Sequence, residues 1–179
     1  MIIDVRRAER RIAAVDQHFA EVVERWQPQL LRHARATIRD GGAAEEAVQD
    51  TLVSAWRHLD EFRGDASMRT WLFTILARKI VDHLRRRTPI LTADGELDMP
   101  CPDVLADPFQ AVSAKDFTDA LHTNLSRLPH RQRACWLLRE VELMTYPEIG
   151  MVMDLSEDAA RGQVVRARAA LRHGLADWR

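Results

Sequence analysis

Apolar residues recur every three or four positions along most of this 179-residue chain, and this spacing restricts it to helices. Such a series places a single apolar stripe along a helix. No segment shows the alternating pattern of a half-buried strand. The sequence therefore predicts an all-α protein. The clearest stripe lies within residues 43–62 and consists of Ala44, Val48, Leu52, Ala55, Leu59 and Phe62.

Three helices are expected in the first half of the chain. The first covers about residues 16–40, with Pro28 expected to break it or to start a new helix, and the Gly41-Gly42 pair ends it. The second covers about 43–62. After the loop Arg63–Ser67, a third runs to about Arg87, and its inward side chains are Leu72, Ile75, Leu76, Ile80 and Leu84.

A change in composition follows the third helix. Four of the seven prolines (Pro89, Pro100, Pro102 and Pro108) fall within twenty residues, where acidic side chains are also frequent. This composition is typical of an extended linker. We therefore expect two small helical domains, at 1–88 and 111–179, joined by a linker at 89–110.

The second half predicts four helices that end in a helix-turn-helix pattern. Two cover about 111–127 and 130–143, and the second of these buries Ala134, Leu137, Leu138 and Val141. Thr145 and Glu148 form a capping box for a short helix that ends near Met153. Ser156 then caps a last helix, whose inward stripe is Ala160, Val164, Ala167, Leu171, Leu175 and Trp178. From spacing alone, an ordinary helical hairpin fits this pattern equally well.

The distribution of charge favours a polyanionic partner, although the formal net charge is only −1. Residues 61–91 hold seven basic and three acidic side chains, and residues 161–179 hold five Arg against Asp177, so each segment has a balance of +4. Acidic residues predominate between them. A mixed solvated surface is the alternative reading.

Several side chains have the chemistry of nucleic-acid recognition. On the last helix, Arg161, Gln163 and Arg166 are candidates to read base edges, and Gly162 would allow close approach. On the third helix, Trp71 and Phe73 accompany Arg69, Arg78 and Lys79, as in sites where bases stack and cations hold the backbone. For either aromatic residue alone, a place in the core is the more common role. A polar stripe (Glu46, Asp50, Ser54, Arg57 and Glu61) is by itself an ordinary solvated face.

Other classes of function find little support. The two cysteines, Cys101 and Cys135, have no CxxC spacing, and His130 with Cys135 does not make a zinc site. Nucleotide-binding loops and hydrolase motifs are absent from the sequence. We therefore expect no enzyme activity, cofactor or metal. Without a signal peptide or a membrane helix, the cytoplasm is the expected compartment.

Two stretches of the chain resemble the extracytoplasmic-function sigma factors of the sigma-70 family. AEEAVQDTLVSAWRHLDEFRGDASMRTWLFTILARKIVDHLRRR, residues 44–87, resembles their second conserved domain. LSRLPHRQRACWLLREVELMTYPEIGMVMDLSEDAARGQVVRARAAL, residues 125–171, resembles their fourth. They occur in the order typical of that family, and a linker stands in place of the third domain.

The resemblance implies a role in promoter-specific initiation of transcription by core RNA polymerase. The β′ clamp helices would bind Glu46, Gln49, Asp50, Ser54 and Arg57, and the β flap would be a second contact. The −10 element would be melted and bound by Arg63, Asp65, Ser67, Arg69, Trp71, Arg78 and Lys79. The −35 element would be read by Ser156, Arg161, Gln163, Arg166 and Arg168. The linker would thread through the polymerase, and an anti-sigma factor is an expected partner.

The recognition helix departs from the usual family pattern. There, a Gly-Thr pair precedes the reading residues, and an Arg is expected where this chain has Gln163. Asp158 and Ala159 replace the Gly-Thr pair. Glu157 and Asp158 suit a helix N-terminus but would repel phosphate if they faced DNA. We therefore expect the −35 contacts of this chain to differ from the usual family pattern. A helix-turn-helix regulator without a direct sigma role and a helical adaptor for another protein are the alternatives.

Overall fold

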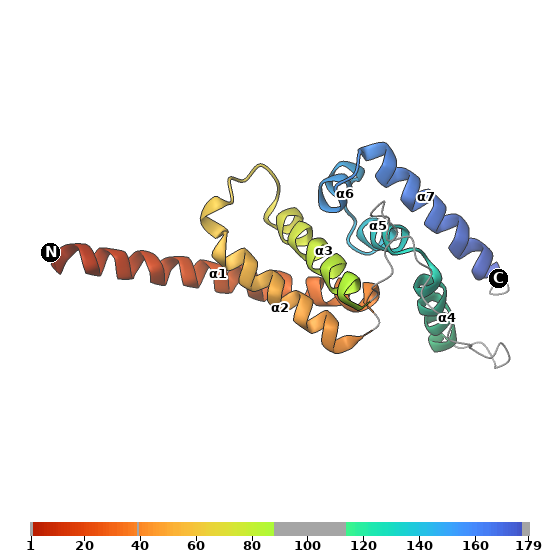
Figure 1. Ribbon diagram of the computed structural model, residues 1–179, viewed down its shortest axis with the longest axis horizontal. Coiled ribbons are helices and arrows are strands. Elements are labelled where there is room, and N and C mark those ends of the chain that lie inside the picture. The colour runs from red at the N-terminus through yellow and green to blue at the C-terminus, as the bar shows by residue number, and fades with distance from the viewer. Residues whose placement is uncertain (1, 39, 88–113, 177–179) are drawn as a thin grey trace.

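The computed structural model is entirely helical in the part of the chain that it describes, residues 2–38, 40–87 and 114–176 (Figure 1). The N-terminal helices are α1 (Ile2–Thr37), α2 (Gly41–Arg57), the short 3₁₀ helix η1 (Leu59–Glu61) and α3 (Met68–Arg87). The C-terminal helices are α4 (Ala114–Arg127), α5 (His130–Glu140), α6 (Tyr146–Met153) and α7 (Glu157–Gly174). The all-α prediction is confirmed, whereas the linker predicted at 89–110 lies outside the described residues.

The first helices differ from expectation in several details. Helix α1 begins at Ile2 rather than near residue 16, and α2 ends at Arg57 rather than near residue 62. Pro28 lies inside α1, which continues through it to Thr37, so the predicted break is wrong. The helix tolerates the lost hydrogen bond because Leu30 and Ala34, directly after the proline, are fully buried and hold the next turns against the core. Gly41 and Gly42 are the first residues of α2, where the Asp40 side chain accepts a hydrogen bond from the Ala43 amide.

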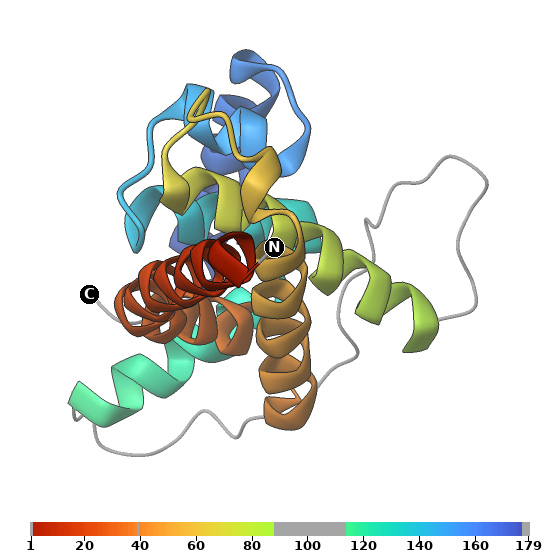
Figure 2. The same ribbon diagram turned by 90° about the vertical axis from the view of Figure 1, so that its left-hand side faces the viewer.

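The N-terminal helices pack by the apolar stripes that the sequence indicates. Helix α1 lies beside α2, and α3 packs on both of them (Figures 1 and 2). Ala44, Val48 and Ala55 are buried on α2, as are Leu72, Leu76 and Ile80 on α3. Phe73 is also buried and meets the His33 ring edge-on, with 5.3 Å between the ring centroids. Phe73 is therefore a core residue.

The C-terminal helices form the predicted helix-turn-helix. The Thr145 side chain accepts a hydrogen bond from the Glu148 amide, and the Glu148 carboxylate accepts one from the Thr145 amide, so the capping box is confirmed. Ser156 caps α7 through the Ala159 amide. Four predicted stripe residues of α7, Ala160, Val164, Ala167 and Leu171, are buried. Val141, in contrast, is 42% exposed, because α5 ends at Glu140 and the chain turns away.

The N-terminal and C-terminal helices are in contact with each other. Helix α3 packs on α6, and α1 packs on α5. One cluster of buried side chains runs from α1 to α7, and a smaller one joins α4 to α7 through Leu125, Leu128, Ala167 and Leu171. A cavity of about 280 Å³ lies where the two sets of helices meet, lined by α3, the start of α5 and the end of α6.

Candidate polymerase and promoter interfaces

The outer face of α2 carries the residues predicted to bind core polymerase. Glu46, Gln49, Asp50 and Arg57 are exposed, and Ser54 is half-buried. Two large apolar side chains lie on the same face, because they follow Gln49 at helical spacing: Val53 is 48% exposed and Trp56 is 52% exposed. The prediction from sequence did not include these two. Their spacing relative to the buried stripe could have identified them, since neither belongs to that stripe.

The loop before α3 holds the first residues predicted to bind the −10 element. Arg63 and Asp65 are exposed on either side of Gly64, whose φ of 78° suits glycine. Ser67 accepts a hydrogen bond from the Thr70 amide at 3.1 Å and so caps the start of α3. The loop therefore presents charge of both signs on an anchored helix N-terminus.

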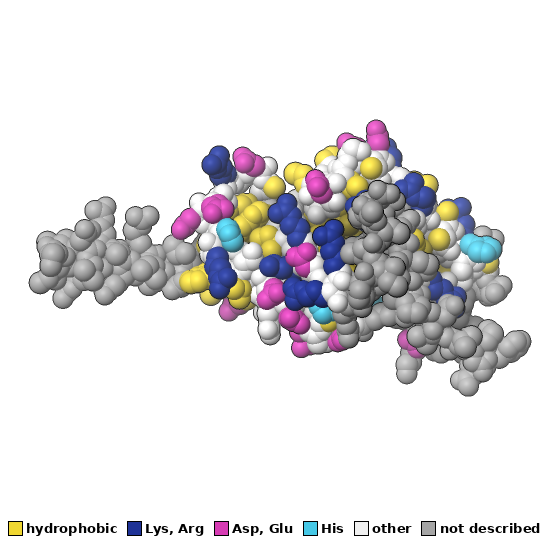
Figure 3. All heavy atoms as spheres, viewed as in Figure 1, with side chains coloured by type: hydrophobic (Ala, Val, Ile, Leu, Met, Phe, Trp, Pro, Cys, Tyr) yellow, Lys and Arg dark blue, Asp and Glu magenta, His cyan; other side chains and the backbone are white. Residues whose placement is uncertain are grey.

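Helix α3 carries the remaining −10 candidates, but they face different surroundings. Trp71 is half-buried against Phe62, with ring centroids 5.1 Å apart. Arg78 is exposed at the cavity between the two sets of helices, and Lys79 is half-buried. Figure 3 shows Lys and Arg side chains gathered over α3, in the middle of the face it presents. Within the described part of the chain, Arg69 is the one candidate that forms an ion pair with the C-terminal helices, to Glu142.

On α7, the predicted −35 residues point in several directions. Arg166 is exposed, and Gln163 is half-buried. Arg161 pairs with Glu157 at 2.8 Å and lies 4.8 Å from the centroid of the Tyr146 ring. Arg168 pairs with Glu140 of α5. The outward face is therefore represented best by Arg166 and by Val165, which is 56% exposed and was not predicted.

Hydrogen bonds shift the pKa values of two ionisable groups near these surfaces. Hydrogen bonds from the backbone and side chain of Thr145 lower the pKa of Glu148, and Arg69 and Thr70 of α3 add to the effect. A hydrogen bond to Glu140 raises the pKa of Arg168. Burial raises the pKa of the Cys135 thiol to about 12, which makes this side chain a core residue without nucleophilic character.

Among the described residues, no group of three or more His, Cys, Asp or Glu side chains is arranged to hold a metal ion. Within those same ranges, every helix is too short or too polar to cross a membrane. The candidate surfaces are the exposed faces of α2, α3 and α7 and the loop before α3.

Comparison with known proteins assigns the family. Residues 22–90 match Sigma-70 region 2, and residues 118–171 match Sigma-70 region 4. The sigma factor NccH of Alcaligenes xylosoxydans xylosoxydans is 32% identical over 166 residues, which cover 90% of this chain and 89% of that protein. The chain belongs to the sigma-70 family, in its extracytoplasmic-function group. It is an alternative sigma factor, and core RNA polymerase and promoter DNA are the partners that this family implies.

Solved structures agree in fold. The structure of CnrH in complex with the cytosolic domain of CnrY has a TM-score of 0.67 at 28% identity, and the match covers 90% of each chain. The sigma factor RpoE of Bartonella quintana, in complex with the anti-sigma factor NepR, has a TM-score of 0.66 at 23% identity. That match covers 89% of this chain and 97% of RpoE. The second likeness establishes the fold alone.

Proposed function

We propose that the three surfaces divide promoter recognition among them. The outer face of α2 binds the β′ clamp helices of core polymerase, and the loop before α3 binds and melts the −10 element together with α3. Helix α7 reads the −35 element in the major groove. The observation that supports this proposal is that both matched regions, 22–90 and 118–171, present exposed polar and basic side chains at most of the predicted positions.

The α2 surface has the composition of a protein interface. Trp56 and Val53 provide exposed apolar area, and Gln49, Asp50 and Arg57 surround them with polar groups. Interfaces commonly place an aromatic anchor inside such a polar rim. This arrangement supports binding of a protein rather than of DNA at α2.

The α7 surface suits a DNA groove. The helix begins with a capped turn, and Val165 and Arg166 are exposed opposite the buried stripe. An arginine can pair with a guanine edge, and an apolar side chain can contact a thymine methyl group. Glu157 is held by Arg161, so part of the acidic start of α7 is neutralised within the helix. This ion pair lessens the repulsion that the sequence predicts.

The remaining assignments follow from the same role. We propose region boundaries at 1–88 and 111–179, a cytoplasmic location and no enzyme activity. The solved complexes named above suggest that this chain, too, is held by an anti-sigma factor. Such a partner would compete with polymerase for the apolar part of α2.

Transcription with purified core polymerase tests the proposal. Core polymerase with this protein should start transcripts at a restricted set of promoters on genomic DNA, and sequencing of their starts should reveal shared −10 and −35 elements. Core polymerase alone is the control. Transcripts that require a different sigma factor would instead identify a helix-turn-helix regulator, and their complete absence would overturn the sigma assignment.

A further inference from the structure

Glu142 joins the two sets of helices from a turn. It lies between α5 and α6, and only 1% of its side chain is exposed. Its neighbour Leu143 has a φ of 56° and is 78% exposed, while Met144 on the other side is fully buried. A leucine rarely adopts this backbone conformation. The turn thus points the side chains of Glu142 and Met144 into the interior and leaves the side chain of Leu143 exposed in an unfavourable backbone conformation.

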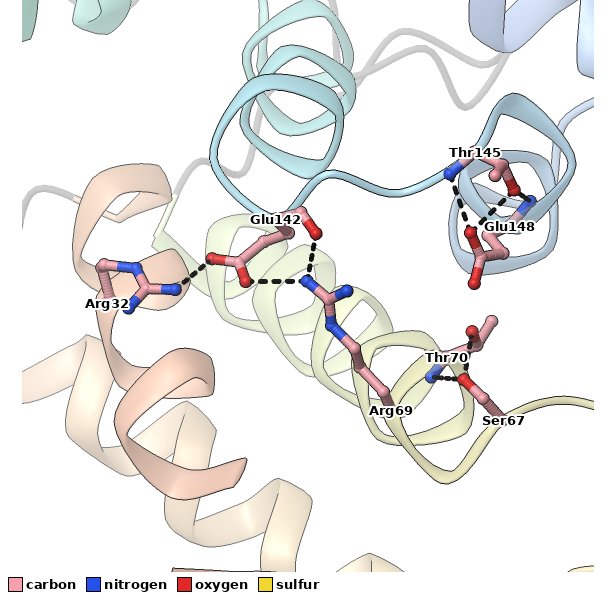
Figure 4. Close-up of polar contacts among 7 residues, drawn as sticks. All are labelled: Arg32, Ser67, Arg69, Thr70, Glu142, Thr145 and Glu148. Carbon is pink, nitrogen blue, oxygen red and sulfur yellow. Dashed lines mark hydrogen bonds and ion pairs between the residues drawn. The ribbon is translucent and has the colours of Figure 1, made fainter. Parts of the chain in front are cut away.

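The carboxylate of Glu142 binds two arginines from the N-terminal helices (Figure 4). One oxygen accepts a hydrogen bond from Arg32 of α1 at 2.9 Å, and the other accepts one from Arg69 of α3 at 3.0 Å. The same Arg69 nitrogen also donates to the backbone carbonyl of Glu142. We call these three residues the Glu142 cluster. Because 73 and 110 residues separate the partners along the chain, the cluster exists only when the helices are docked.

Arg69 is enclosed by the docked helices. Only 24% of its side chain is exposed, and its guanidinium lies 5.7 Å from the centroid of the Phe73 ring. Glu148 of α6 faces it as a second carboxylate, close enough for Arg69 to contribute to the lowered pKa of Glu148. Carboxylates and phosphates use the same guanidinium donors. A phosphate of promoter DNA that binds Nη2 of Arg69 would therefore have to displace Glu142.

Away from the Glu142 cluster, the same interface is incompletely packed. The cavity of about 280 Å³ lies between α3 and α6, and Arg78, Arg85, Met151 and Met153 are among its lining residues. The side chains that line this partly open pocket lack packing partners on one side, so this part of the interface contributes less to docking than a filled core would. Contacts between domains of one chain are often reversible for such reasons.

We propose that Glu142 is an intramolecular competitor for promoter DNA. In the free protein, it holds the C-terminal helices against α3 and occupies Arg69. Release of Arg32 and Arg69 from Glu142 then precedes −10 binding, so polymerase or DNA that favours the separated helices activates the factor. This inference rests on the proposed role of Arg69 in binding the −10 element. Docking of the two sets of helices weakens DNA binding, and DNA binding weakens docking to the same degree, because both use Arg69.

Distance measurements test the docking without reference to transcription. Spin labels at Glu24→Cys on α1 and Ala170→Cys on α7, in a Cys101→Ser background, would report the separation of the two sets of helices. Both labelled positions are exposed. Glu142→Gln removes the charge but keeps the shape of the side chain. It should raise the ratio of separated to docked molecules roughly fivefold or more, the range of typical coupling energies.

Glu140→Gln is the matched control, because it also removes a carboxylate that pairs with an arginine. Glu140 lies two residues earlier and pairs with Arg168, but this ion pair joins α5 to α7 within the C-terminal helices. Glu140→Gln should therefore leave the distance distribution unchanged. Equal distributions for wild type, Glu142→Gln and Glu140→Gln would overturn the proposal. If Glu142→Gln fails to fold, Arg32→Gln is the second variant. It removes one ion pair of the Glu142 cluster, and it should be tolerated because the Arg32 side chain is 53% exposed.

DNA binding by the free protein provides the second measurement. The probe is a fluorescent single-stranded oligonucleotide that carries the −10 sequence found by transcript mapping. Glu142→Gln should bind it roughly fivefold or more tightly than wild type does, whereas Arg69→Gln with Glu142→Gln should lose the gain. Separation without tighter binding would overturn the competition. A wild-type protein that fails to start transcripts with core polymerase would instead refute the proposed function.

Discussion

The guanidinium of Arg161 lies 4.8 Å from the centroid of the Tyr146 ring, which joins the two helices of the helix-turn-helix. Arg139 lies 4.9 Å from the centroid of the same ring, so the tyrosine stands between two cations. Stacking of this kind holds an arginine in place. Because Glu157 also binds Arg161, that side chain is already engaged before DNA arrives. Among the predicted −35 arginines, Arg166 is then the best candidate to read a base.

Arg166→Ala should weaken binding of the polymerase complex to its −35 element. A lost bidentate contact to guanine costs about 1–3 kcal/mol, which is roughly fivefold to 150-fold in affinity. Electrophoretic mobility shifts with duplex promoter DNA would measure the change. Arg168→Ala is the control, because Glu140 already binds that guanidinium. A larger loss for Arg168→Ala than for Arg166→Ala would reverse the assignment.

Trp56→Ala should weaken binding to core polymerase without destabilising the fold. The side chain is 52% exposed, so its removal leaves no cavity. Aromatic anchors at protein interfaces contribute about 2 kcal/mol or more, which is roughly thirtyfold in affinity. Titration with a purified β′ clamp-helix fragment measures the effect. Phe117→Ala on α4, another exposed aromatic residue, should bind that fragment normally. Wild-type affinity for Trp56→Ala would exclude Trp56 from the interface.

Gly150→Ala should destabilise the helix-turn-helix. A Cβ at this position would lie 2.7 Å from the backbone oxygen of Leu155, so the turn between α6 and α7 must shift. Overpacking of this kind costs about 1–3 kcal/mol. Urea unfolding would measure the loss. Gly41→Ala is the matched control, because nothing lies within 4 Å of a Cβ there. Equal stability of the two variants would show that the α6–α7 turn yields easily.

Acidification should destabilise the protein through two buried histidines. Burial lowers the pKa of His33 to about 3, and His130 and Arg32 add to the effect. Burial also lowers the pKa of His130 to about 4, with contributions from Arg133 and Arg131. Both pKa values lie below the usual 6.5. The unfolded chain therefore binds more protons than the folded chain does between pH 6.5 and about 4, and stability falls as the pH falls through this window.

The expected loss is roughly 1.4 kcal/mol for each histidine at pH 5.5 relative to neutral pH. Urea unfolding at pH 7.5 and 5.5 would measure it. His33→Phe should remove about half of the dependence, whereas His58→Gln, at an exposed position, should retain it. A stability that is flat between these two pH values would contradict the burial of both rings.

Much of the fold could be predicted because its signals are local. The buried stripes of α2, α3 and α7 follow from helical spacing, and the Thr145–Glu148 box and the Ser156 cap follow from side chains three residues from their partners. Pro28 misled the prediction, because packing of the flanking turns outweighed one missing hydrogen bond. Val53 and Trp56 were missed, because the prediction selected only polar side chains on that face, although helical spacing places both outside the buried stripe.

The sequence by itself determined the helices, their caps and the family, since these depend on neighbours within a few residues or on motifs read in order. Only the tertiary structure decided which of the predicted DNA-binding residues are available. Arg69 and Arg78 look alike in sequence, yet one binds Glu142 and the other lines a cavity. The reason is physical: an ion pair between residues 73 positions apart depends on how the helices dock, and helical periodicity carries no information about docking.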